Sequence, residues 1–108
     1  MSFRAIVAYP NDGSSKFDIE YYLSTHMPLV EELFKPFGLQ RWEVIQFAGE
    51  PGSSPEFAVQ TILFWQNADQ MKQANASGGG KRLVADIANF SKVRPVTLAG
   101  NVVGQSKL

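Results

Sequence analysis

The sequence has no cysteine, and this absence excludes disulfides, thiolate metal sites and a cysteine nucleophile. It has a single histidine, His26, so zinc sites with several histidine ligands are excluded as well. Ten basic and ten acidic residues cancel, and this balance gives no electrostatic signature of binding to nucleic acid or to an anionic membrane. No segment approaches the roughly 20 apolar residues that a membrane span needs. We therefore expect a cytoplasmic protein without a membrane segment.

The residues that are present suit one globular domain. Hydrophobic residues make up 44% of the 108 residues and charged residues 19%, which is typical of a folded chain. Because no repeat, low-complexity tract or linker divides the sequence, a single domain is expected over residues 1–108.

Apolar alternation, helical spacing and turn residues predict six elements. Strands are expected over residues 2–9, 39–48, 57–65 and 93–103. Helical segments are expected over residues 18–37 and 67–89, with a break at residues 77–80 (SGGG), and a turn at residues 10–15 (PNDGSS). The order βαββαβ is the ferredoxin-like α+β arrangement, a four-stranded antiparallel sheet with its helices on one face.

The predicted strands carry apolar residues on both faces. In the second strand, Trp42 and Val44 point to one face, and Ile45 and Phe47 point to the other. An antiparallel sheet with one solvated face should instead alternate between apolar and polar residues. A second copy of the chain is the simplest cover for the second face, so we predict a homodimer in which two sheets pair.

The first helical segment places its histidine on an apolar face. The residues that recur at helical spacing are Ile19, Tyr22, Leu23, His26, Val30, Leu33, Phe34 and Phe37. Pro28 cannot donate a backbone hydrogen bond to the carbonyl of Ser24, and it disfavours helical geometry at Met27. A kink or a restart of the helix is therefore predicted beside His26.

Two interpretations of His26 remain open. In the first, His26 is a core residue hydrogen-bonded to a freed carbonyl or to a strand side chain. In the second, it is an acid/base or ligand-orienting group in a small pocket between helix and sheet. Tyr22 stands one helical turn earlier, and a phenol and an imidazole at that spacing can share a ligand or a water.

Three stretches of the sequence form a recognisable set: YP at residues 9–10, FDIEYYLSTHMPLVEEL at 17–33, and SGGGKRLVADIANF with the following VRPV at 77–96. Together they resemble the EthD family, small dimeric α+β barrel proteins named after a component linked to ethyl tert-butyl ether degradation. The matching positions are Tyr9, Pro10, Phe17, Asp18, Tyr21, Tyr22, His26, Pro28, Leu29, Gly78, Gly79, Asp86, Asn89 and Phe90.

The resemblance implies a ferredoxin-like protomer whose sheet pairs with a second one to make a barrel. Some related fungal members are cofactor-free decarboxylases or dehydratases that act on aromatic polyketides. The wider barrel group includes monooxygenases without cofactors and haem-binding proteins. Carried onto this chain, the functional position is His26, with Tyr21 or Tyr22 close by.

The SGGGKR stretch has an alternative interpretation as a phosphate loop. Such a loop needs Gly at position 75 and Ser or Thr at position 82, where this chain has Asn75 and Arg82. A break between two helices, capped by Ser77 or a glycine, is therefore predicted. Asp86 further along either forms a solvated ion pair or serves as the proton partner of His26.

The sequence thus predicts a protein that binds a small apolar, aromatic or ether-like molecule between the first helix and the sheet. The leading hypothesis is a cofactor-independent enzyme. The alternatives are a non-catalytic binding or accessory protein of a degradation pathway, and a haem protein with His26 as axial ligand. The candidate catalytic residues are His26, Tyr22 and Tyr21; the candidate ligand-binding residues are Tyr9, Trp42, Trp65 and Asp86; no metal ligands and no cofactor are expected.

Overall fold

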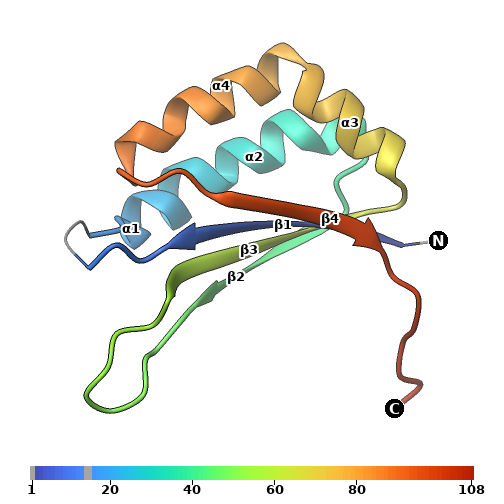
Figure 1. The fold of residues 1–108 in the computed structure, drawn as a ribbon. Coiled ribbons are helices and arrows are strands. Elements are labelled where there is room, and N and C mark those ends of the chain that lie inside the picture. The colour runs from blue at the N-terminus through green and yellow to red at the C-terminus, as the bar shows by residue number, and fades with distance from the viewer. Residues whose placement is uncertain (1, 14–15) are drawn as a thin grey trace.

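The computed structural model describes residues 2–13 and 16–108, and its helices cover one face of a four-stranded antiparallel sheet (Figure 1). The strands are β1 (Phe3–Pro10), β2 (Arg41–Gln46), β3 (Phe57–Trp65) and β4 (Val96–Asn101). They lie in the order β2-β3-β1-β4, which confirms the predicted ferredoxin-like fold. The turn expected at residues 10–15 includes residues 14 and 15, which lie outside the described residues.

Two of the strands are shorter than predicted. β2 loses residues at both ends, and β4 begins only after Pro95. Proline has no backbone N–H to donate to a sheet, so pairing with β1 starts at Val96, which lies opposite Ala8. β4 is an edge strand, where a neighbouring proline is tolerated.

One continuous helical segment follows β1. It consists of α1 (Ile19–Tyr21), a π-helical turn η1 (Tyr22–His26), α2 (Met27–Phe34) and a 3-10 turn η2 (Lys35–Phe37). The side chain of Asp18 caps it by accepting a hydrogen bond from the backbone N–H of Tyr21 at 3.1 Å. It ends at Gly38, whose φ of 110° is in the left-handed region that glycine adopts without strain.

The predicted restart of the helix is present, since α2 begins at Met27 with Pro28 in its first turn, but the predicted departure of Met27 from helical geometry was wrong. Met27 keeps helical angles (φ −67°, ψ −38°), and its N–H donates to the carbonyl of Tyr22, five residues back. An α-helix would bring the ring of Pro28 against the carbonyl of Ser24, and the wider π turn carries the chain past the proline without a break. The extra residue also shifts the helical phase. Met27 is 1% exposed, whereas Leu23, predicted to be buried, is 45% exposed.

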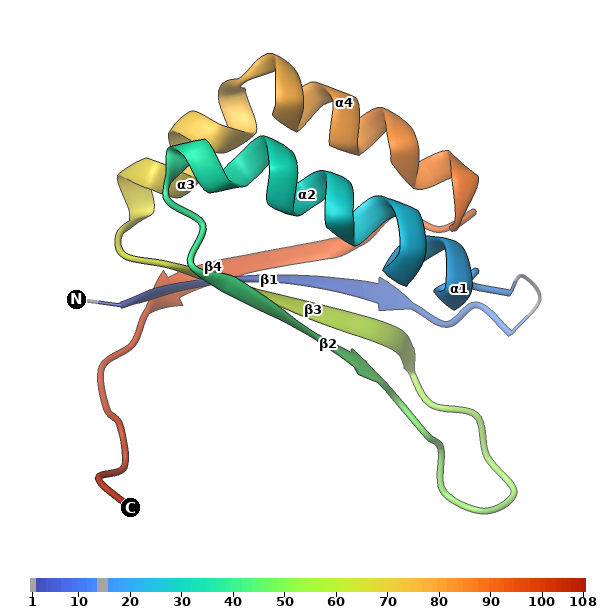
Figure 2. The same ribbon diagram turned by 180° about the vertical axis from the view of Figure 1, so that it is seen from behind.

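The second helical region consists of α3 (Ala68–Ala76), α4 (Gly78–Asp86) and the 3-10 turn η3 (Ile87–Asn89). The predicted break is present at Ser77. Its hydroxyl donates to the carbonyl of Ala74 at 2.6 Å and accepts from the N–H of Gly80 at 3.1 Å. One side chain therefore ends α3 and caps α4, which lets α4 run beside α2 above the sheet (Figure 2).

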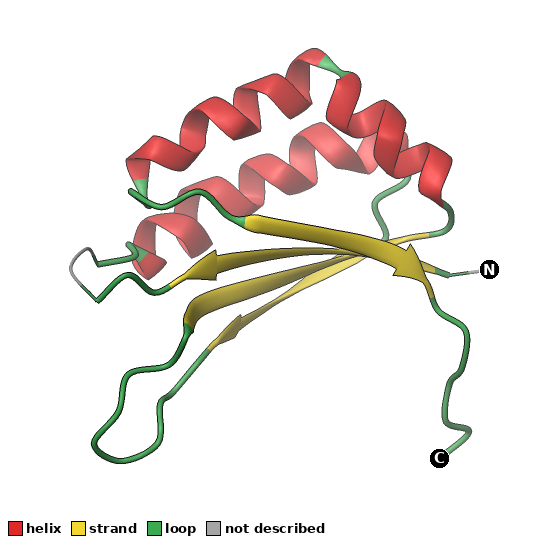
Figure 3. Ribbon diagram, in the orientation of Figure 1, coloured by secondary structure: helices red, strands yellow, loops and turns green. Residues whose placement is uncertain are grey.

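The sheet is apolar on both faces, as predicted. Toward the helices, β3 buries Val59, Leu63 and Trp65 in the core. No helix covers the other face (Figure 3). There, Phe64 contacts the guanidinium groups of Arg4 and Arg41, at 4.1 and 3.8 Å from its ring centroid. On this face Ile45 and Leu98 remain 41% and 60% exposed. Within the described residues, no helix has both the length and the apolar character to cross a bilayer.

Candidate functional site

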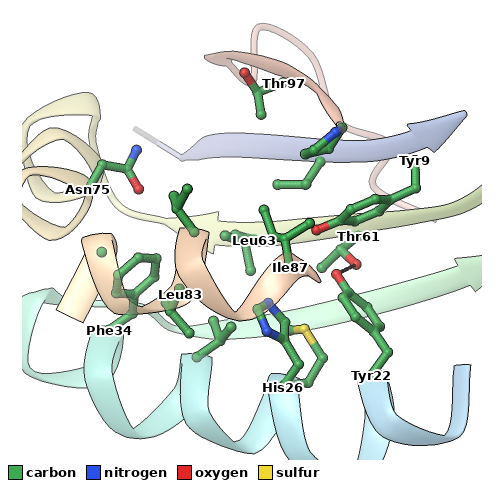
Figure 4. A pocket seen from close by; sticks show the side chains of 16 residues that line it. Tyr9, Tyr22, His26, Phe34, Thr61, Leu63, Asn75, Leu83, Ile87 and Thr97 are labelled. Atoms are coloured by element: carbon green, nitrogen blue, oxygen red, sulfur yellow. Dashed lines mark hydrogen bonds between the residues drawn. The ribbon is translucent and has the colours of Figure 1, made fainter. Parts of the chain in front are cut away.

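A cavity of about 180 Å³ lies between the helices and the inner face of the sheet (Figure 4). Its walls come from η1, α2 and α4 and from strands β1, β3 and β4, and most of the lining side chains are apolar. Its polar side chains are those of Tyr9, Tyr22, His26, Thr61, Asn75 and Thr97. The cavity is therefore a mainly apolar space with a few polar groups, as is usual for a small-molecule site.

The imidazole of His26 packs against two aromatic rings, which also contact each other, at the edge of this cavity. It is 5% exposed and stacks on the ring of Tyr22, with centroids 5.1 Å apart and planes 15° apart. The ring of Phe90 contacts it from the loop after η3, with a centroid distance of 4.5 Å. These contacts fix the plane of the imidazole and remove much of its hydration.

A hydrogen bond to Asp86 orients the two nitrogens of His26. Nδ1 lies 2.8 Å from Oδ2 of Asp86. A carboxylate only accepts hydrogen bonds, so Nδ1 carries the proton and Nε2 of the neutral ring is an acceptor. No partner in the described part of the chain bonds Nε2, and this nitrogen is not among the fully buried unpartnered atoms. It is the basic group that His26 offers to a molecule in the cavity.

Asp86 is itself held by two further donors. The hydroxyl of Tyr21 donates to Oδ1 at 2.7 Å, and Nδ2 of Asn89 donates to the same oxygen at 2.9 Å. Burial acts to raise the pKa of this carboxyl group, but the hydrogen bonds that it accepts outweigh burial and hold the pKa of Asp86 below its ordinary value. Asp86 is therefore ionised near neutral pH and always available as an acceptor for His26.

Burial also decides the charge of His26. It lowers the pKa of the imidazole below its ordinary value of 6.5, although the hydrogen bond and the negative charge of Asp86 oppose this shift. His26 is consequently neutral at pH 7, the state in which Nε2 can accept a proton.

Three hydroxyl groups gather near the stacked rings of His26 and Tyr22. The hydroxyls of Tyr22 and Thr61 are 2.5 Å apart, and Tyr9 reaches the same cluster from β1 (Figure 4). Burial raises the pKa of Tyr9 above its ordinary value, and it raises the pKa of Tyr22 to about 12. Both phenols are thus protonated at neutral pH and can donate hydrogen bonds to an oxygen of a bound molecule.

The structure brings some of the predicted site residues together and separates others. His26, Tyr22 and Tyr9 line the cavity, and Tyr21 and Asp86 form the support on the outer side of the imidazole.

The two tryptophans lie elsewhere. Trp42 is on β2 and donates its indole N–H to Glu31 at 2.8 Å. Trp65 is fully buried against Phe34, with ring centroids 5.7 Å apart. Neither residue lines the cavity.

Sequence reasoning did not include Thr61, Asn89 or Phe90 among the candidate catalytic or ligand-binding residues. A signal existed for each of them. Thr61 alternates with Val59 and Leu63 on the inward face of β3, so a polar group among them marks a partner in the core. Asn89 and Phe90 follow Asp86 at three and four residues, which places all three on one side of a helical turn.

The cavity does not suit a haem or a metal ion. It is close to the roughly 150 Å³ that a single benzene ring occupies in a protein interior, so a porphyrin does not fit beside Nε2 without displacement of α2 and α4. Within residues 2–13 and 16–108, no group of three or more metal-binding side chains occurs.

With the fold and the site described, comparison with known proteins is informative. No family model matches the sequence. The chain is similar to an uncharacterised 11.0 kDa protein of the thcB–thcC intergenic region of Rhodococcus erythropolis, with 26% identity over 91 residues that cover 82% of this chain and 84% of that protein.

Solved structures give a closer match. An EthD-like protein from Ralstonia eutropha superposes with a TM-score of 0.87 at 26% identity, covering 98% of this chain and 96% of the other. An EthD family protein from Bacillus halodurans gives a TM-score of 0.76 at 23% identity, with 95% and 100% covered. Over nearly its whole length, the chain is therefore similar to EthD-like proteins.

More distant structures share the fold of this chain. SnoaB of Streptomyces nogalater, a cofactor-independent oxygenase, has a TM-score of 0.72 at 9% identity, with 99% and 98% of the two chains covered. A dimeric ferredoxin-like protein of unknown function from Jannaschia has a TM-score of 0.66 at 8% identity, with 94% and 98% covered. At these identities the likeness concerns the fold alone.

Proposed function

We propose that this protein is a cofactor-independent enzyme that moves a proton to or from a small, mainly apolar molecule bound beside His26. The observation that carries the proposal is the arrangement of the imidazole. Its Nδ1 is held by Asp86, and its Nε2 is left as an acceptor at the edge of the cavity.

The proposed chemistry divides between the imidazole and the neighbouring phenols. Neutral His26 accepts a proton from the bound molecule through Nε2 and returns it later in the reaction. Protonated Tyr9 or Tyr22 donates a hydrogen bond to an oxygen on which negative charge develops. Proton transfer of this kind is common to decarboxylation, dehydration and cofactor-independent oxygenation, and the last of these is the activity of the structural neighbour SnoaB. Aromatic and ether-like molecules are the substrates that the apolar lining favours.

Deuterium exchange into phenylacetone tests the proposal without knowledge of the natural substrate. This probe has one aromatic ring and an acidic C–H next to a carbonyl group, and NMR in D₂O measures its exchange. The wild-type protein should accelerate exchange over buffer, and His26→Gln should abolish the acceleration. Lys72→Gln, an exposed change on α3, is the control. Acceleration that survives in His26→Gln would contradict the role of the imidazole.

A non-catalytic carrier is the alternative, and the predominantly apolar lining of the cavity favours it. It predicts that phenylacetone binds with similar affinity to wild type and His26→Gln, and that neither protein accelerates exchange. Binding without exchange in the wild-type protein would therefore favour the carrier over the enzyme.

We further propose that the protein acts as a homodimer that pairs the sheet faces not covered by helices. Exposed Ile45 and Leu98 on that face support this, as do structural neighbours that are dimeric ferredoxin-like proteins. The absence of cysteine supports a reducing compartment, the cytoplasm, as its location.

A further inference from the structure

The cavity beside His26 adjoins an open groove at the surface. Val84, Ile87 and Pro95 line both spaces, so the two meet between α4 and the loop that leads into β4. The groove has a volume of about 440 Å³ and Val84 at the junction is 69% exposed. A bound molecule that extends past these side chains therefore enters the groove.

The groove carries positive charge. Lys92 and Arg94 line it, and no aspartate or glutamate does. Within the described part of the chain, neither cation takes part in an ion pair. Because the whole chain has a net charge of zero, two unpaired cations beside one opening create a local field that attracts anions.

The inner cavity is a poor place for an anion. Its polar groups are neutral, most of its lining is apolar, and it contains no lysine or arginine. The carboxylate of Asp86, 2.8 Å behind Nδ1 of His26, adds an unfavourable negative charge. Burial of an unpaired charge in such surroundings is costly, so a charged end stays outside.

We propose that the ligand is an amphiphilic anion, with a compact apolar body about the size of one ring in the cavity and a carboxylate or similar group held by Lys92 and Arg94 in the groove. This inference rests on the proposed function, because it uses the same cavity. In this proposal the anionic group contributes to binding, and the reacting atoms belong to the apolar body, next to Nε2 of His26. The carboxylate at the groove is not the group that reacts.

Two probes of nearly the same shape test this assignment. Phenylacetate carries the charge and phenylacetamide does not, and calorimetric titration at low ionic strength measures the affinity of each. Wild type should bind phenylacetate at least tenfold more tightly than phenylacetamide. The double variant Lys92→Gln/Arg94→Gln should lose roughly tenfold in affinity for phenylacetate and none for phenylacetamide. The preference of wild type should also shrink in 0.5 M salt, since exposed charges are screened.

The double variant Lys72→Gln/Lys81→Gln is the matched control, because it removes two exposed positive charges from α3 and α4 that line neither space. Equal affinities for the two probes in wild type, or an equal loss in both double variants, would refute the role of the anionic group. The apolar cavity would then still stand as the ligand site. Binding of neither probe would overturn the cavity itself as a ligand site, and with it both proposals.

Discussion

Replacement of Asp86 by asparagine tests the support of the imidazole directly. In wild type the carboxylate accepts a hydrogen bond from Nδ1–H of His26 at 2.8 Å, which fixes Nε2 as the acceptor facing the cavity. Asparagine has nearly the same shape, and its oxygen can keep the hydrogen bonds from Tyr21 and Asn89. Its NH₂ group then faces Nδ1 and donates, so Nδ1 must lose its proton and Nε2 must gain one.

The size of this tautomer change follows from the hydrogen bond. A hydrogen bond to a charged group contributes about 1.5–3 kcal/mol net, and each 1.4 kcal/mol is a factor of ten in an equilibrium constant. Asp86 should therefore favour the Nδ1–H tautomer of His26 by a factor of about 10 to 150. Asp86→Asn also removes the two influences that raise the pKa of His26, so this pKa should fall further below 6.5.

Nitrogen NMR measures both effects without ambiguity, because His26 is the only histidine in the chain. At pH 7.5 the wild-type protein should show a protonated Nδ1 and an unprotonated Nε2, and Asp86→Asn should show the reverse. The acceleration of deuterium exchange into phenylacetone should fall in Asp86→Asn as well, since a protonated Nε2 cannot act as a base. Asp69→Asn, an exposed change on α3, is the control. The same tautomer in wild type and Asp86→Asn would refute the role given to the carboxylate.

Three further outcomes are expected. Gly80→Ala should lower stability by about 1–3 kcal/mol in urea unfolding, because its Cβ would lie 2.4 Å from the carbonyl oxygen of Asn75, whereas Gly78→Ala, with nothing within 4 Å, should change it by less than about 1 kcal/mol. The urea midpoint should fall as the pH is lowered through and below 6.5, because the folded state holds the pKa of His26 below its ordinary value. In that range the unfolded chain binds a proton that the folded protein does not, so stability is lost; a midpoint that does not fall between pH 7 and 5 would contradict this. Sedimentation should give twice the 11.9 kDa of one chain for wild type and one chain for Leu98→Asp, and a wild-type mass of one chain would disprove the paired sheets.

The fold was predictable because local signals and the overall pattern agree. Asp18, Gly38 and Ser77 mark helix ends through their own chemistry, and each does so in the structure. The two-faced strands followed from alternation alone. The position of β4 was predicted correctly, but the predicted strand, residues 93–103, was longer than the observed Val96–Asn101. The effect of Pro95 on the first residues depends on which edge of the sheet the strand occupies.

The candidate site was predictable only in part. Periodicity turned His26 toward the sheet, and the structure has it 5% exposed there. The contact with Asp86 joins residues 60 positions apart, and no spacing rule specifies a pair so distant. A fixed helical period also predicted Leu23 on the buried face, where the structure has Met27 instead. The prediction failed because the period itself changes in η1.

The π turn makes the first helix sensitive to length in a way that an ordinary α-helix is not. One residue corresponds to a rotation of about 100° in an α-helix. Deletion of the exposed Thr25 would restore a regular period while leaving the apolar face of α2 in place, but it would swing Tyr21 and Tyr22 around the helix axis. It would also bring the ring of Pro28 against a carbonyl four residues earlier. Insertions and deletions in η1 should therefore be tolerated far less well than substitutions at the same exposed position.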